Sequence, residues 1–163
     1  MQDAISIIKD EHISISSVLK GLVTHVEDAL GAKRDFDPFL VSAMLDYIET
    51  VPERVHHPKE DQYLFRLLRK RTDKANEALD QLEEEHKKSK LLLKDMRVAL
   101  AQCKKDGDLK NFAEAMNSYS RFHFAHMRKE EKDVFPLAVE YLTPEDWKEV
   151  HEAFRLNMKV DMV

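Results

Sequence analysis

The stretch LDQLEEEHKKSKLLLKDMRVALAQC, residues 79–103, decides the fold of this chain. Apolar residues and one histidine recur in it at intervals of three, four or seven, as Leu79, Leu82, His86, Leu93, Met96, Leu100 and Cys103. Side chains at this spacing share one face of an α-helix, and the charged residues between them cover the other face. We therefore expect a long helix over about residues 74–105, capped at its start by Thr72 and Asp73.

Comparable patterns predict helices on both sides of this stretch. Residues 3–30 carry one such pattern, and Gly31 follows as a stop signal. Asp37 and Pro38 open a second helix that runs to about residue 70 and is bent or broken at its internal prolines, Pro52 and Pro58.

The last third of the chain continues the helical pattern. A fourth helix starts near Leu109 and is ended or bent at Pro136. A short fifth helix runs from Pro144 to about Asn157, and Trp147 with Phe154 docks it on the others.

The predicted fold class is all-α: an antiparallel up-down four-helix bundle with a short fifth C-terminal helix. We expect one domain over residues 1–163, with the bundle over about 3–140 and the terminal helix over about 144–157. Three glycines and five prolines are too few for the many turns of a β-sandwich or barrel.

Composition also narrows the function. The net charge of −5 without a basic stripe argues against nucleic-acid binding, and no apolar run is long enough to span a membrane. The N-terminus meets charge too early for a signal peptide, and the single cysteine, Cys103, fits a core position in a chain with no intrachain disulfide. We expect a cytoplasmic protein.

An internal repeat carries the chemistry. HHPKEDQYLF at residues 56–65 aligns without a gap with HMRKEEKDVF at residues 126–135. Each copy places a histidine four residues before a glutamate, as His56–Glu60 and His126–Glu130. On a helix this spacing stacks the two side chains on one face, within reach of a common ion.

A second repeat precedes each of these motifs. Glu11-His12 lies in the first predicted helix and Glu85-His86 in the third, and each histidine replaces an apolar residue of its pattern. Four helices can thus bring four imidazoles and two carboxylates to one level of the core. This set suits iron, manganese or zinc, and six ligands are a natural supply for two ions that share carboxylates. Buried without partners, these groups would be costly.

Two assignments stay open at this point. His57–Asp61 is also an i,i+4 pair, and we expect only one of the two registers to face the core, because adjacent helical positions diverge by about 100°. The repeat favours His56–Glu60, with Asp61 pointing sideways. His123 could be an additional ligand, a hydrogen-bond donor to a ligand or part of the pocket wall. The two remaining histidines, His25 and His151, are expected at packing or surface positions.

These motifs resemble the hemerythrin family, specifically the bacterial hemerythrin-like HHE cation-binding domains. The resemblance covers residues of about 3–140, and it implies a non-haem di-iron centre in a four-helix bundle. Two iron ions (Fe²⁺/Fe³⁺) would be bridged by two carboxylates and an oxo or hydroxo group. The ligands carried over are His12, His56, Glu60, His86, His126 and Glu130, and the implied partner is dioxygen or another small diatomic ligand.

One departure from the family pattern bears on the activity. Oxygen-carrying hemerythrins have two histidines spaced i,i+4 on the third helix, whereas Lys90 follows His86 here. Fewer histidines leave a coordination position open, which suits oxygen or nitric oxide sensing, peroxide chemistry or iron handling as well as oxygen carriage. We expect a metal- and oxygen-binding protein rather than an enzyme.

Two other interpretations remain. A ferritin-type di-iron carboxylate protein would use Glu53-x-x-His56 and Glu83-x-x-His86 together with Glu11 and Glu130, but it leaves His12 and His126 without a role. A metal-free helical interaction domain would use none of these residues as ligands. The chain shows no nucleophile–base arrangement that would indicate a hydrolase.

Overall fold

The computed structural model describes the backbone of residues 2–160 and the side chains of residues 4–156. All regular elements in this range are helical, which confirms the all-α class. The first and third long segments are single helices, α1 (Gln2–Leu30) and α5 (Asn76–Asp106). The second segment is a continuous run of α2 (Pro38–Ile48), η1 (Glu49–His56), α3 (His57–Lys59), η2 (Glu60–Phe65) and α4 (Arg66–Arg71), where η denotes π-helix. The fourth runs through α6 (Lys110–Lys129), η3 (Glu130–Val134) and α7 (Phe135–Tyr141), and α8 (Pro144–Val160) follows.

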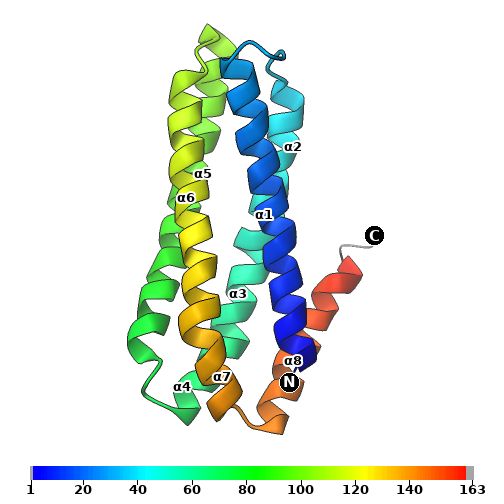
Figure 1. The fold of residues 1–163 in the computed structure, drawn as a ribbon, viewed down its shortest axis with the longest axis vertical. Helices are drawn as coiled ribbons and strands as arrows, with labels where there is room; N and C mark the ends of the chain where they lie inside the picture. The colour runs from blue at the N-terminus through cyan, green and yellow to red at the C-terminus, as the bar shows by residue number, and fades with distance from the viewer. Residues whose placement is uncertain (1, 161–163) are drawn as a thin grey trace.

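The four long segments lie side by side along the long axis of the molecule (Figure 1). Helix α6 packs against α5 and α1, and α2 packs against α1 and α5. The terminal helix α8 lies against α1 and η2 near the end that holds the N-terminus (Figure 1). None of the helices in the described range is long and apolar enough to cross a membrane.

The prolines interrupt neither segment, so the break that was one of the two expected effects, beside a bend, does not occur. Pro52 and Pro58 do not break the second segment, and Pro136 does not end the fourth, which continues to Tyr141. A proline has no N–H to donate, so an α-helical hydrogen bond is lost at each. At these positions the backbone changes from α-helical to π-helical hydrogen bonding. Pro52 lies inside η1, where the N–H of His57 donates to the carbonyl of Pro52. The π-helix η3 directly precedes α7, which contains Pro136. The two π-helices η2 and η3 begin at the equivalent repeat positions Glu60 and Glu130.

Helix starts follow the sequence signals in two of three cases. The Asp37 carboxylate accepts hydrogen bonds from the N–H groups of residues 39 and 40 and so caps α2, as predicted. At α8, Thr143 Oγ1 accepts from the N–H of Asp146, and the Asp146 carboxylate accepts from the N–H of Thr143. Thr72 instead accepts from the N–H of Lys74 within a turn, and α5 starts later than predicted, at residue 76.

Two apolar clusters form the core. One gathers around Ile8, Phe65, Leu82 and Phe154 at the α8 end, and it includes Trp147, so the predicted docking of the last helix is confirmed. The other runs from Ile15 to the far end and contains Cys103, at the core position predicted for it. Between the two clusters lies a layer of buried histidines and glutamates. An interior layer of this polarity needs partners of its own.

Candidate metal site

The polar layer contains every residue of the predicted ligand set. All six residues are buried, with at most 3% of each residue's surface exposed: His12, His56, Glu60, His86, His126 and Glu130. They come from α1, η1, η2, α5, α6 and η3, so all four long segments contribute. Their donor atoms fall into two neighbouring groups, each close enough to hold an ion.

The first group consists of His12, His56, Glu60 and Glu130. The Nε2 atoms of His12 and His56 lie 3.1 Å apart, and Glu60 Oε1 lies 2.6 Å from His56 Nε2. Glu130 Oε2 approaches His12 Nε2 to 3.7 Å. Two nitrogens that bind one ion at about 2.1 Å and at a right angle would lie about 3 Å apart. The histidine separation therefore matches two ligands of a common ion.

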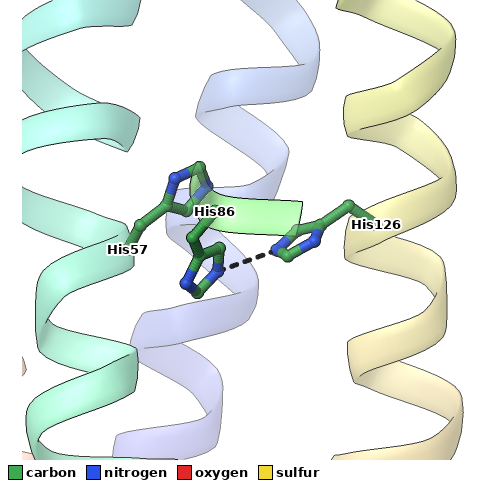
Figure 2. Close-up of side chains that lie close together, drawn as sticks. All are labelled: His57, His86 and His126. Atoms are coloured by element: carbon green, nitrogen blue, oxygen red, sulfur yellow. Dashed lines mark hydrogen bonds between the residues drawn. The ribbon is translucent and has the colours of Figure 1, made fainter. Parts of the chain in front are cut away.

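The second group consists of His57, His86 and His126 (Figure 2). The Nε2 atoms of His86 and His126 are 3.0 Å apart, and the ring of His57 stacks on that of His86 at 4.2 Å between centroids. His57 is as deeply buried as His56, which contradicts the expectation that only one of them faces the core. His56 ends the π-helix η1, and His57 begins the α-helix α3. Both side chains point into the core, His56 toward the first donor group and His57 toward the second.

Glu60 lies between the two groups. Its Oε1 faces His56, and its Oε2 lies 3.2 Å from His86 Nε2. Neither Glu60 Oε2 nor either oxygen of Glu130 has a hydrogen-bond partner among the described residues. A carboxylate with one oxygen toward each group is placed to join two ions.

A carboxylate lies against the outer nitrogen of each of the four predicted histidine ligands. His12 Nδ1 donates to Glu131 at 2.9 Å, and His86 Nδ1 donates to Asp61 at 2.8 Å. These acceptors directly follow the repeat glutamates, so Asp61 has the sideways position predicted for it and a defined partner there.

The other two carboxylates come from the positions before the lone histidines. His56 Nδ1 donates to Glu11 at 2.7 Å, and His126 Nδ1 donates to Glu85 at 2.8 Å. Neither glutamate is assigned a role at a hemerythrin-like site by the sequence. The signal was present in the Glu-His dipeptide repeat, but only the helix packing shows which histidine each glutamate meets.

The pKa values of the buried histidines diverge, and burial lowers that of His126 despite its hydrogen bond to Glu85. Burial alone would lower the pKa of His12, His56 and His86, but hydrogen bonds and charges of their carboxylate neighbours raise each to about 9. Burial lowers the pKa of His57 and His123 well below the usual value, and neighbouring histidines add to the effect. The two buried glutamates diverge: burial and the charge of Glu60 raise the pKa of Glu130, while His56 and His12 outweigh burial and lower that of Glu60.

A third group of donors, Glu53, His57 and His123, adjoins the second. Glu53 accepts hydrogen bonds from Tyr119 Oη at 2.8 Å and from Ser89 Oγ. Glu53 has a role in the sequence only under the ferritin-type interpretation, and neither Ser89 nor Tyr119 is assigned a role at the site there. The internal repeat does relate two of these residues. Glu53 and His123 occupy equivalent positions, three residues before His56 and His126.

The remaining candidates lie outside the layer. His25 is a packing residue, as expected, and its Nε2 accepts from the N–H of Asp37. Glu83, which the ferritin-type interpretation requires, forms an ion pair with Arg69 at 3.2 Å. A solvent-facing groove between α1 and α6 reaches the first group, and its lining includes His12, Met127 and Glu131.

Comparison with known protein families matches residues 3–138 to the Hemerythrin HHE cation binding domain. The comparisons with curated proteins and with solved structures found no match.

Proposed function

The chain belongs to the hemerythrin HHE cation-binding family, and from this premise we propose that it is a non-haem di-iron protein that binds dioxygen or another small diatomic ligand. The observation that carries the proposal is the pairing of two donor groups across Glu60. Imidazole and carboxylate donors together are the set that iron accepts readily.

In this proposal His12 and His56 hold one ion, and His86 and His126 hold the other. Glu60 would be shared between them, and Glu130, which lies in the first donor group, would be the second carboxylate ligand. His57 belongs to the second donor group and would be a fifth histidine ligand. In oxygen-carrying hemerythrins the fifth histidine lies four residues after the first histidine of the third helix. That position is Lys90 here, and it is exposed.

The buried atoms support a cation at each group. Glu60 Oε2, both oxygens of Glu130 and both ring nitrogens of His57 lack hydrogen-bond partners among the described residues. Leaving a buried polar atom unpaired costs about 1–3 kcal/mol, and more for a charged group. Two divalent ions would satisfy most of these atoms and neutralise the buried carboxylates.

The residues around the donors prepare them for metal. The carboxylates of Glu11, Asp61, Glu85 and Glu131 hold the proton on Nδ1 of their histidines, which leaves Nε2 free to bind and fixes each ring. The apolar clusters on both sides keep bulk water away from the layer. The groove beside His12 gives a small molecule an approach from solvent.

A bound iron pair would supply reversible oxidation and an open position for a diatomic ligand. The proposal includes the antiparallel four-helix bundle and the single-domain organisation, which the side-by-side segments and the family match over residues 3–138 support. The ion pair of Glu83 with Arg69 argues against the ferritin-type alternative.

Metal content tests the proposal. Full-length protein, freed of metal and reloaded anaerobically with Fe²⁺, should retain at least two irons per chain and develop the near-ultraviolet absorption of an oxo-bridged ferric pair on exposure to oxygen. His126→Ala should lose at least one iron and most of that absorption. His151→Ala, outside the layer, is the matched control and should behave as the unchanged protein.

A protein that retains at most one ion per chain would contradict the proposal. So would equal iron content and spectra in the His126→Ala and His151→Ala variants.

A further inference from the structure

Two ions bound as proposed above leave part of the polar layer without partners. His123 is 1% exposed, and neither of its ring nitrogens has a hydrogen-bond partner among the described residues. Glu53 Oε2 and His57 Nδ1 also lack partners, and they face each other at 3.5 Å. Such atoms are costly when buried, so the three side chains require a further partner.

Glu53 is held in the manner of a metal ligand. Tyr119 and Ser89 both donate to Oε1, which fixes the carboxylate and leaves Oε2 free toward His57. Hydrogen bonds of this kind orient first-coordination-sphere carboxylates in metal sites.

The group occupies a defined level of the fold, about one helical turn from the proposed pair. Glu53 and His123 precede the repeat histidines by three residues, and Ser89 follows His86 by three. The corresponding position on α1, three residues after His12, is the buried Ile15. Three long segments therefore extend the polar layer in one direction, and the fourth closes it with an apolar side chain.

The chemistry of the group favours a cation over a water molecule. A buried water could satisfy His123, but it would leave the buried Glu53 carboxylate without a balancing charge. Two imidazoles and one carboxylate are a donor set for divalent first-row transition metals such as Fe²⁺, Co²⁺ or Zn²⁺. The three donor atoms lie within 4.8 Å of one another, close enough for one ion.

We propose that Glu53, His57 and His123 form a third site for a divalent transition-metal ion, beside the proposed pair. His57 faces both sites, with Nδ1 toward Glu53 and Nε2 left for the pair. When both nitrogens are bound, the ring gives up its N–H proton to solvent. The third site rests on the proposed function only through this shared ring.

Metal stoichiometry with Co²⁺ as the probe tests the third site. The full-length metal-free protein is loaded with Co²⁺ under nitrogen, desalted and analysed for cobalt per chain. The unchanged protein should retain three equivalents. Glu53→Gln and His123→Ala should each retain two, with circular dichroism reporting that they fold. Ser120→Ala, a buried neighbour outside the group, is the matched control and should retain three.

A cobalt-loaded crystal of the unchanged protein gives a second measurement that needs no variant. An anomalous-scattering peak between Glu53 and His123 is expected. Retention of only two equivalents by the unchanged protein, or of equal numbers by it and His123→Ala, would overturn the third site. Failure of the proposed pair has a different signature, because His126→Ala would then retain as much cobalt as the unchanged protein.

Discussion

Each histidine of the polar layer is specialised by what its two nitrogens meet. In His12, His56, His86 and His126, Nδ1 donates to a carboxylate and Nε2 points to the centre of a donor group. The carboxylate fixes the tautomer, which matters because only a nitrogen without a proton can bind a metal. No carboxylate among the described residues forms such a bond with His57 or His123, whose rings stack on each other, and His57 also stacks on His86.

A single outer carboxylate should therefore control metal affinity. Replacing Glu85 by glutamine weakens the acceptor for His126 Nδ1, so we expect affinity at the second group to fall about 10- to 100-fold. Competition with a chromogenic chelator measures the change. The control is Glu84→Gln, because Glu84 is exposed and forms an ion pair with Lys87 on the helix surface. Equal affinities in the two variants would remove the role given to Glu85.

At the scale of elements, the local helix geometry places the donor side chains in the polar layer. The π-helices η2 and η3 start at equivalent glutamates of the repeat and shift the register there. As a result Glu60 faces the layer, and the next residue, Asp61, accepts a hydrogen bond from His86. In the second copy of the repeat Glu130 faces the layer, and Glu131 accepts a hydrogen bond from His12. Single-turn π-helices are frequent at functional sites for this reason.

The end of α1 shows a different local solution. The N–H of Lys33 donates to the carbonyl of Asp28, and the N–H of Ala32 to that of Ala29, as in a Schellman motif. The left-handed position of this motif is occupied by Ala32, with φ of 56°, and not by the preceding Gly31 that the sequence indicated as the stop. A side chain at this position costs about 1 kcal/mol.

Replacing Ala32 by glycine should therefore stabilise the protein, by about 0.5–1 kcal/mol, since glycine adopts a positive φ without this strain. Chemical denaturation of the loaded protein measures the difference. Gly107→Ala is the matched comparison at the end of α5, where the glycine already has φ of 74°, and it should destabilise by a similar amount. A neutral or destabilising result for Ala32→Gly would show that the motif is not strained.

At the scale of the whole molecule, the layer separates two apolar clusters and joins all four long segments. Buried charges without a bound metal reduce the stability of the fold. Metal bound by ligands from all four segments increases it, because an ion that binds only the folded state stabilises that state by mass action. The stabilisation is about 4 kcal/mol at a metal concentration a thousand times Kd.

This linkage gives a pH dependence. In the metal-free protein the pKa values of His12, His56 and His86 rise from 6.5 to about 9 on folding. Protonation of these groups therefore stabilises the fold fully below pH 6.5, and this contribution is lost as the pH rises through about 9. Metal competes with the same protons and binds better as the pH rises. We expect the difference in Tm between cobalt-loaded and metal-free protein to widen from pH 6.5 to 9.

Differential scanning fluorimetry of the two forms over this range measures the difference. His151→Ala should follow the unchanged protein at every pH. A difference in Tm that stays constant or narrows as the pH rises would contradict the assignment of these three histidines to the metal site.

The sequence by itself determined the class of fold and the composition of the candidate site. Helical periodicity depends only on local spacing, so the long helices, the cap at Asp37 and the docking residues Trp147 and Phe154 could be predicted from it. The repeat identified His56, Glu60, His126 and Glu130, because an i,i+4 pair shares a helix face wherever that helix lies.

Only the tertiary structure decided which side chains meet across helices. His57 with His86, Glu11 with His56, and Glu53 with Tyr119 are contacts between segments far apart in the chain. The shift to π-helical register could not be deduced from the prolines, since η2 contains none. Local spacing fixes the face of a helix, but the rotation and level at which two helices pack depend on the whole core at once, and this packing determines the partners of each donor.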